Sequence, residues 1–208
     1  MFPQLVRHIS EDRFSTYLEA AGFDADRAVA LYAWNMQLSA SFYPLLSAVE
    51  ICLRNRIQPR LATVFGETWW LAPELHVVMG GTGKGIMLRA AKAIEKRGGR
   101  STAGQMTAEL CFGFWSNMLL PKYEDHLWQP VQSGFPDLPG HLSLGDLHHR
   151  SERVRDLRNR ISHHEHIFRR DLTEEYSNAI TLLAWLGPEK AAWIRPRLDT
   201  MKLLRARP

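Results

Sequence analysis

Apolar side chains recur every three to four residues along most of the chain, which is the spacing of one face of an α-helix. Residues 10–21 are an example, because Phe14 and Leu18 lie on a common face and Gly22 follows where helices commonly end. Asp24 is a suitable N-terminal cap for the next helix. No segment keeps the strict alternation of a β-strand, so the pattern predicts an all-α chain.

The predicted helices are separated by short links that contain glycine, proline or polar residues. They cover about 10–21, 25–65, 84–97, 107–120, 143–164, 171–186 and 188–204. Pro44 makes the second of these either one long bent helix or two in series. Residues 129–142 are rich in proline and glycine and are expected to form a connection. Adjacent helices with mostly short links predict one all-α domain over residues 1–208.

Glycines gather in the segment G-G-T-G-K-G at residues 80–85. A phosphate-binding P-loop needs a glycine five residues before the Gly-Lys pair and a serine or threonine after it. Val78 and Gly85 occupy those two places, so we reject that interpretation. We expect instead a flexible loop region over about 78–104, with a basic helix inside it.

Composition indicates a globular protein with an ordinary share of apolar and charged residues. No apolar run approaches the ~18–20 residues of a membrane helix, and the N-terminus lacks the pattern of a signal peptide. Cys52 and Cys111 lie in apolar stretches and are expected to be buried thiols. These features predict a cytoplasmic protein with no membrane partner.

The net charge of +4 favours a nucleic-acid partner weakly, but the arginines are concentrated within residues 150–170. Guanidinium groups pair bidentately with phosphate, so this concentration suits RNA. We predict that four of these arginines contact RNA. They are Arg155, Arg160, Arg169 and Arg170.

The segment at residues 155–167 reads R-D-L-R-N-R-I-S-H-H-E-H-I and holds the candidate chemistry. On an ideal helix Leu157 and Ile161 face the core, while Asn159 and His163 share another face. Arg158 is then about 140° from His163. The two can converge on one phosphate if the helix ends near His163, or if two copies of the segment face each other.

These residue types suit RNA cleavage. Attack of a 2′-hydroxyl on the adjacent phosphate needs a proton acceptor and a proton donor, and histidine can be either near neutral pH. Arginine can stabilise the charge that develops on the phosphate oxygens. This scheme requires neither a metal ion nor another cofactor. The pentapeptide L-R-N-R-I also occurs at residues 53–57 without a following histidine, so only the copy at 157–161 has acid-base groups beside it.

The same arginines and histidines are compatible with two roles that involve no RNA. Arginines on an amphipathic helix are commonly a solvated face, and the helix dipole favours histidines near a C-terminus. The histidines could also be zinc ligands, but the H-E-x-x-H pattern and any finger-type pairing of cysteine with histidine are absent. The histidines close enough in sequence for such a zinc site are His148, His149, His163, His164 and His166. We therefore predict no metal site.

Arg158-Asn159-x-x-x-His163 resembles the R-x4–6-H motif of the HEPN superfamily, and L-R-N-R-I-S-H-H-E-H-I-F resembles its Abi-like branch, which is linked to bacterial abortive infection. The likeness covers most of the chain and is least distinctive over residues 75–105. Other similar strings are L-Y-A-W-N-M-Q-L-S-A-S-F (31–42), L-x-x-V-E-I-C-L-R-N (46–55), G-E-T-W-W (66–70), F-G-F-W (112–115), L-W-Q-P (127–130) and A-W-L-G-P-E (184–189). Ser162 departs from the pattern, where alanine is more usual.

The resemblance implies a HEPN-like helical bundle with additional helices and a metal-independent endoribonuclease that acts as a toxin or phage-defence effector. It also implies a homodimer in which two motif copies form one cleft, and a neutralising antitoxin protein as a possible partner. By motif position, Arg158 would contact the scissile phosphate, with Asn159 as polar support. His163 would be the general acid or base, and His164 is a second candidate.

The resemblance also assigns supporting roles on an earlier helix to Glu50, Arg54 and Asn55, although a buried ion pair or a cap would account for them equally well. Two further functions remain open. The segment could bind RNA or a nucleotide without cleaving it, or it could serve only as a dimer interface.

Overall fold

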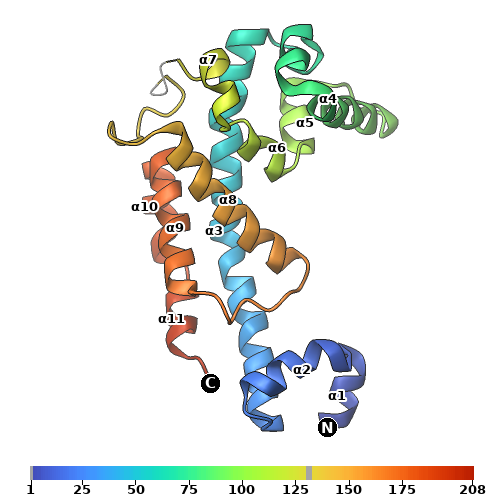
Figure 1. Cartoon of the computed structure of the whole chain (residues 1–208), viewed down its shortest axis with the longest axis vertical. Coiled ribbons are helices and arrows are strands. Elements are labelled where there is room, and N and C mark those ends of the chain that lie inside the picture. Colours follow the sequence, from blue (N-terminus) through green and yellow to red (C-terminus); the bar gives the residue numbers. More distant parts are fainter. Residues whose placement is uncertain (1, 130–132) are drawn as a thin grey trace.

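The computed structural model describes residues 2–129 and 133–208, with the side chains from residue 6 onward (Figure 1). Within these residues the chain forms α-helices and short 3-10 turns and no β-strand, which confirms the predicted all-α fold. The α-helices are α1 (Phe2–Ile9), α2 (Glu11–Ala20), α3 (Ala25–Phe65), α4 (Pro73–Lys96), α5 (Ala103–Glu109), α6 (Phe112–Asn117), α7 (Glu124–Leu127), α8 (Leu144–Ser162), α9 (Leu172–Leu186), α10 (Pro188–Ile194) and α11 (Thr200–Arg205). The 3-10 turns are η1 (Trp69–Leu71), η2 (Pro121–Tyr123) and η4 (Arg195–Arg197).

The long helix α3 is the axis around which the other helices are arranged (Figure 1). It begins at the predicted cap, where the Asp24 carboxylate accepts a hydrogen bond of 3.0 Å from the amide of Arg27. Pro44 and Pro59 lie inside it, and both are exposed, so their rings point away from the core. The segment 25–65 is therefore one continuous helix.

By length and composition α3 could cross a membrane, so the expectation that no stretch of the chain is apolar enough was wrong. A core helix of a soluble protein has the same composition. Leu38, Leu45 and Leu53 are fully buried in the protein interior, as are further residues along the helix. This burial by other helices is the arrangement of a core helix.

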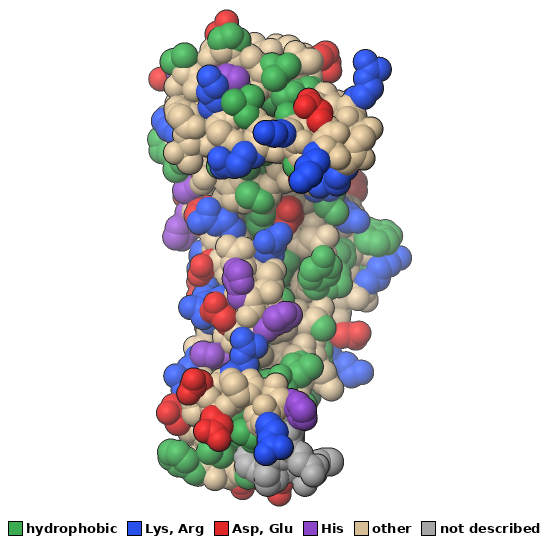
Figure 2. Space-filling view, turned by 90° about the vertical axis from the view of Figure 1, so that its right-hand side faces the viewer, with side chains coloured by type: hydrophobic (Ala, Val, Ile, Leu, Met, Phe, Trp, Pro, Cys, Tyr) green, Lys and Arg blue, Asp and Glu red, His purple; other side chains and the backbone are tan. Residues whose placement is uncertain are grey.

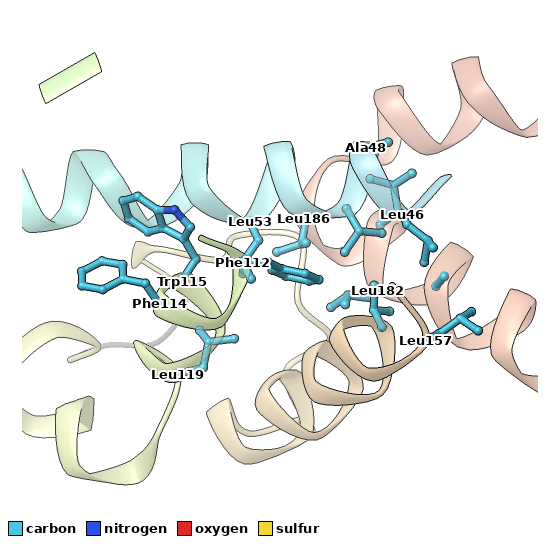
Figure 3. Close-up of a cluster of buried hydrophobic side chains, with 14 of the residues drawn as sticks. Leu46, Ala48, Leu53, Phe112, Phe114, Trp115, Leu119, Leu157, Leu182 and Leu186 are labelled. Atoms are coloured by element: carbon cyan, nitrogen blue, oxygen red, sulfur yellow. The ribbon is translucent and has the colours of Figure 1, made fainter. Parts of the chain in front are cut away.

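The core is formed where α6, α8 and α9 meet α3 (Figure 3). Leu53 of α3 lies beside Phe112 of α6, and Leu182 of α9 lies beside Leu157 of α8. Burying side chains of this size contributes about 1.5–3 kcal/mol each. The core therefore fixes α8 against α3 and α9 and positions the end of α8.

Within the flexible region expected over about 78–104, the basic helix at about 84–97 is confirmed, but the loop expected before it was wrong, because α4 already begins at Pro73 and runs to Lys96. Gly80 joins two helical pieces with φ 70° and ψ −178°, a conformation available to glycine. Helix continues beyond it because Gly83 packs against Met79, and Met87 and Ile94 are buried. Tertiary burial outweighs the low helix propensity of the glycines.

Two other predicted helices are broken. The segment 107–120 is divided between α5 and α6, because Leu110 and Cys111 are extended and the Leu110 carbonyl accepts a hydrogen bond of 3.2 Å from the Trp115 indole. The segment 188–204 is divided into α10, η4 and α11, with Pro196 in η4. Cys111 is exposed at the first break, so the expectation of a buried thiol there was wrong, and Cys52 is half-buried.

Candidate functional site

The helix α8 ends within the arginine-histidine segment, close to its predicted end at residue 164. It begins with a capping box between Ser143 and Asp146 and finishes at Ser162. The amide of His164 then donates to the carbonyl of Ile161 at 3.0 Å, and the amide of Glu165 donates to the carbonyl of Arg160 at 2.9 Å. These two bonds form a Schellman motif, so the chain turns sharply away from the helix axis.

His164 occupies the position of that motif which usually holds glycine, and its φ is 57°. A side chain in this left-handed conformation costs roughly 1–2 kcal/mol. An ion pair of 3.0 Å between Arg160 and Glu165 spans the turn and helps to hold it. The histidine is therefore kept in a strained turn by its neighbours, a feature that is concentrated at functional sites.

His163 and His164 are both exposed at this helix end. No described residue forms a hydrogen bond with either imidazole ring. Both rings are accordingly available to a ligand. Figure 2 shows the face toward which α8 ends, where histidine and Lys or Arg side chains gather across the middle with a few acidic groups among them.

Arg158 lies one turn before the end of α8 and its side chain is 36% exposed. One guanidinium nitrogen is 3.6 Å from Glu50 of α3, and another donates to the Asn159 amide oxygen at 3.3 Å. These contacts orient the guanidinium without using all five of its donors. The structure therefore brings together Arg158, Asn159 and the predicted support Glu50.

The other two predicted supports are not part of this group. Arg54 lies one turn after Glu50 on α3, and its buried Nε has no hydrogen-bond partner among the described residues. Asn55 is exposed. Neither forms an ion pair or a hydrogen bond with Arg158 in the part of the chain that the structure describes.

Each of the four arginines predicted to contact RNA has a carboxylate partner. Arg155 pairs with Glu152, Arg160 with Glu165 at 3.0 Å, Arg169 with Glu19 at 3.4 Å, and Arg170 with Glu175 at 2.6 Å and Asp156 at 3.2 Å. These carboxylates offset much of the positive charge that the sequence concentrates here. The arginines therefore present a weaker attraction for phosphate than their number indicates.

Ion pairs of Arg153 and Arg170 join α8 to α9. Arg153 pairs with Glu174 at 2.5 Å and lies 3.7 Å from the buried Glu175. Burial alone would lower the pKa of Arg170, but its hydrogen bonds to Glu175 and Asp156 outweigh this and raise the pKa. These guanidinium groups stay charged and fasten α9 to α8.

His166 differs from the two exposed histidines because its ring packs against aromatic side chains. The ring centres of Phe168 and Tyr17 are 5.1 Å and 6.4 Å away. Burial lowers the pKa of His166, and the charges of Arg169 and Arg160 lower it further against the opposing effect of Glu165. A neutral ring packed in this way stabilises the turn and is not a candidate for proton transfer.

The chain after the turn is tied to α3. The amide of Ile167 donates to the side-chain oxygen of the buried Asn35 at 2.9 Å. This contact holds the segment after α8 against the first half of α3. Because Asn35 is far away in sequence, nothing in the local pattern predicted it.

Within residues 2–129 and 133–208, no three His, Cys, Asp or Glu side chains come together as ligands for a metal ion. His148 is 4.0 Å from Glu152, but these are only two groups. His163, His164 and His166 do not converge, because the first two are exposed on the turn and the third packs among aromatic rings.

A groove with a volume of about 610 Å³ lies beside His164, between α2, α3 and the end of α8. Sequence patterns did not reveal it. Met36 and Tyr43 keep the helical spacing of apolar residues on α3, yet their side chains are 56% and 65% exposed. Exposure of this kind at apolar positions marks a surface that is available for a ligand or partner.

The sequence matches no protein-family model, no curated protein and no solved structure.

Proposed function

We propose that this protein is a metal-independent endoribonuclease of the HEPN type, with its site at the C-terminal end of α8. The observation that supports this is the arrangement of Arg158, His163 and His164. The helix ends about one turn after the Arg-Asn pair, two unpartnered histidines lie on the turn that follows, and the arginine is held by Glu50.

In the proposed reaction one histidine accepts the proton of a ribose 2′-hydroxyl, and that oxygen attacks the neighbouring phosphorus. The bond from phosphorus to the 5′-oxygen breaks, and a second protonated histidine gives its proton to the leaving oxygen. The products are a 2′,3′-cyclic phosphate and a 5′-hydroxyl. Arg158 stabilises the charge on the phosphate oxygens, and no step requires a metal ion.

The proposal includes a homodimer, because Arg158 faces Glu50 of α3 while His163 is exposed at the turn. A second copy facing the first would bring its histidines toward this arginine. In the cell, such an enzyme would act as a toxin or phage-defence effector, held inactive by an antitoxin protein. These roles come from the resemblance of the motif.

The test compares wild type with His163→Ala and Arg158→Ala on pooled RNA. Removal of an acid-base group is expected to reduce cleavage by about 100-fold or more. His149→Ala is the matched control, because His149 is a histidine of the same helix that lies outside the proposed site. Cleavage at the wild-type rate by both site variants, when folded, would disprove the proposal. A chelator is expected to leave the rate unchanged, and the products should end in 2′,3′-cyclic phosphate.

A second candidate is a module that binds RNA or a nucleotide without cleaving it. The guanidinium donors that Arg158 has left over favour this, because they can hold a phosphate without any proton transfer. This candidate predicts salt-dependent RNA binding by wild type with no product.

If the Arg158→Ala/His163→Ala double variant sediments as a monomer while wild type is a dimer, the segment is an interface.

A further inference from the structure

The groove beside His164 has features that the proposed cleavage chemistry does not use. Its volume of about 610 Å³ lies in the range of small-molecule sites. Its walls are mainly apolar and aromatic. They include Tyr32, Met36, Tyr43, Ile161, Ser162 and His164.

Tyr43 is the most exposed aromatic side chain of the groove, at 65%. Two turns earlier on the same face of α3 lies Met36, which is 56% exposed. Side chains of this type form a surface on which a flat ring can stack, and alanine substitution of a stacking aromatic typically weakens nucleic-acid binding measurably. A planar, uncharged group is therefore the natural occupant of this wall.

The floor of the groove is neutral and its polar groups are satisfied. Asn35 accepts the Ile167 amide and is hydrogen-bonded to Tyr17. Burial, followed by the nearby Tyr32, raises the pKa of Tyr17 to about 12, so its hydroxyl stays protonated. An uncharged base can enter without displacing water from a buried charge.

Arg13 of α2 lines the same groove and supplies a positive charge. It is exposed, and no carboxylate among the described residues pairs with it. Arg13 is therefore free to bind an anion. It differs in this from the arginines that are paired with carboxylates, namely Arg155, Arg160, Arg169 and Arg170. Glu165 is also at the groove, but its charge is offset by Arg160.

From an aromatic wall, a neutral floor and an unpaired guanidinium at one groove, we propose that this groove binds one unpaired nucleotide of a single-stranded RNA. The base stacks on Tyr43 and its phosphate meets Arg13. Because the groove takes an unpaired base, it selects single strands. Because His164 lies beside the bound nucleotide, the next phosphate is placed near the histidines. This inference rests on the proposed function for its RNA substrate, but it concerns a different step, namely binding.

The test uses the full chain carrying His163→Ala, so that RNA is not cut. The probe is a short single-stranded RNA with one 2-aminopurine, whose fluorescence falls when the base stacks on an aromatic ring. Quenching is expected for the single strand and not for the same sequence in a duplex. Tyr43→Ala in this background should weaken binding about 10-fold or more. The matched control Trp193→Ala removes an exposed aromatic on α10, away from the groove, and should have no effect.

Arg13→Gln should reduce the dependence of binding on salt by about one phosphate contact, while Arg195→Gln, another exposed arginine, should not. The proposal is overturned if Tyr43→Ala binds the single strand as tightly as its parent, or if the duplex is quenched equally. It is also overturned if Tyr43→Ala splits a dimer without changing RNA affinity, because a second copy would then cover the groove. Binding of a free mononucleotide as tightly as the strand would overturn the RNA assignment.

The two proposals fail in different ways. If wild type does not cut RNA but the strand is quenched in a Tyr43-dependent manner, cleavage is disproved and the groove assignment stands. If wild type cuts RNA and Tyr43→Ala cuts and binds as wild type does, the groove assignment is disproved and cleavage stands. Thermal unfolding of each variant establishes that it is folded before these outcomes are compared.

Discussion

The pentapeptide Leu-Arg-Asn-Arg-Ile lies in α3 at residues 53–57 and in α8 at residues 157–161, and the two copies have different surroundings. In α3 the helix continues beyond the copy to Phe65. In α8 it ends at Ser162 and the histidine turn follows. The same five residues therefore serve once within a helix and once at a helix end.

The apolar residues have the same role in both copies. Leu53 and Leu157 are buried in the shared core, at 0% and 1% exposure. The arginines differ. Arg56 donates to the Leu186 carbonyl at 2.6 Å and pairs with Asp137 at 2.7 Å, so it fastens distant segments to α3. Arg160 pairs across its own turn, with Glu165. The pentapeptide thus provides a helix with one buried face, and its position decides what the polar residues do.

The largest effects on stability are expected from the two leucines. Leu53→Ala and Leu157→Ala each remove a fully buried side chain, and such changes cost about 2–5 kcal/mol of unfolding free energy. Urea unfolding followed by circular dichroism measures both. A loss below about 1 kcal/mol for either variant would show that its copy does not belong to the core as described.

The arginines at the fourth position should separate the two copies. Arg56→Ala removes a hydrogen bond to a backbone carbonyl and an ion pair, and is expected to cost about 1–3 kcal/mol. Arg160→Ala removes a solvent-exposed pair, which is worth about 1 kcal/mol or less. Equal losses in urea unfolding would contradict the distinction between a long-range and a local role.

His164→Gly is expected to raise stability by about 0.5–1 kcal/mol, because glycine relieves the left-handed conformation at some cost in unfolded-state entropy. The end of α2 provides the control. There Gly22 occupies the same position of a Schellman motif with φ 65°, so Gly22→Ala should lower stability by a similar amount. If His164 takes part in proton transfer, His164→Gly will cut RNA more slowly despite its higher stability. Unchanged cleavage would remove His164 from the mechanism.

The smallest effect is the pH dependence that His166 contributes. Its pKa in the folded protein lies below the ordinary 6.5, so the unfolded chain binds a proton first as the pH falls. Stability should therefore decrease as the pH falls from about 6.5 to the folded-state pKa, and no further below it. His166→Phe keeps the contacts with Tyr17 and Phe168 and should remove this part of the dependence. An identical pH profile for the variant, measured by urea unfolding, would contradict the assignment.

Local sequence predicted those helix ends that are set by a capping residue or by glycine and proline. Asp24 caps α3, Gly22 ends α2, and Gly187 followed by Pro188 separates α9 from α10. The end of α8 lies close to the predicted end of that helix at residue 164. The continuation of α4 through its glycines and the break before α6 depend on tertiary packing, which local patterns do not contain.

The candidate site was predictable to a similar extent. The motif indicated Arg158, Asn159 and His163, and the position of Glu50 beside the arginine followed the resemblance. The partners of Arg169 and Arg170 on other helices, Glu19 of α2 and Glu175 of α9, could not be predicted from local sequence. The groove was missed because Met36 has the spacing of a core residue, and only the arrangement of α2, α3 and α8 shows that it is uncovered.

The contacts of the first half of α3 have a consequence for the order in which the protein can fold during synthesis. The Trp34 indole donates to the Leu203 carbonyl at 2.7 Å, and the Thr200 hydroxyl donates to the Ser41 carbonyl at 3.0 Å, across 169 and 159 residues of sequence. At roughly 5–20 residues per second, a ribosome needs many seconds to supply these partners. Asn35 likewise lacks its partner until Ile167 has been made, so until then the turn that carries His163 and His164 cannot be anchored on α3. The candidate site is therefore assembled only after residue 167 has left the ribosome.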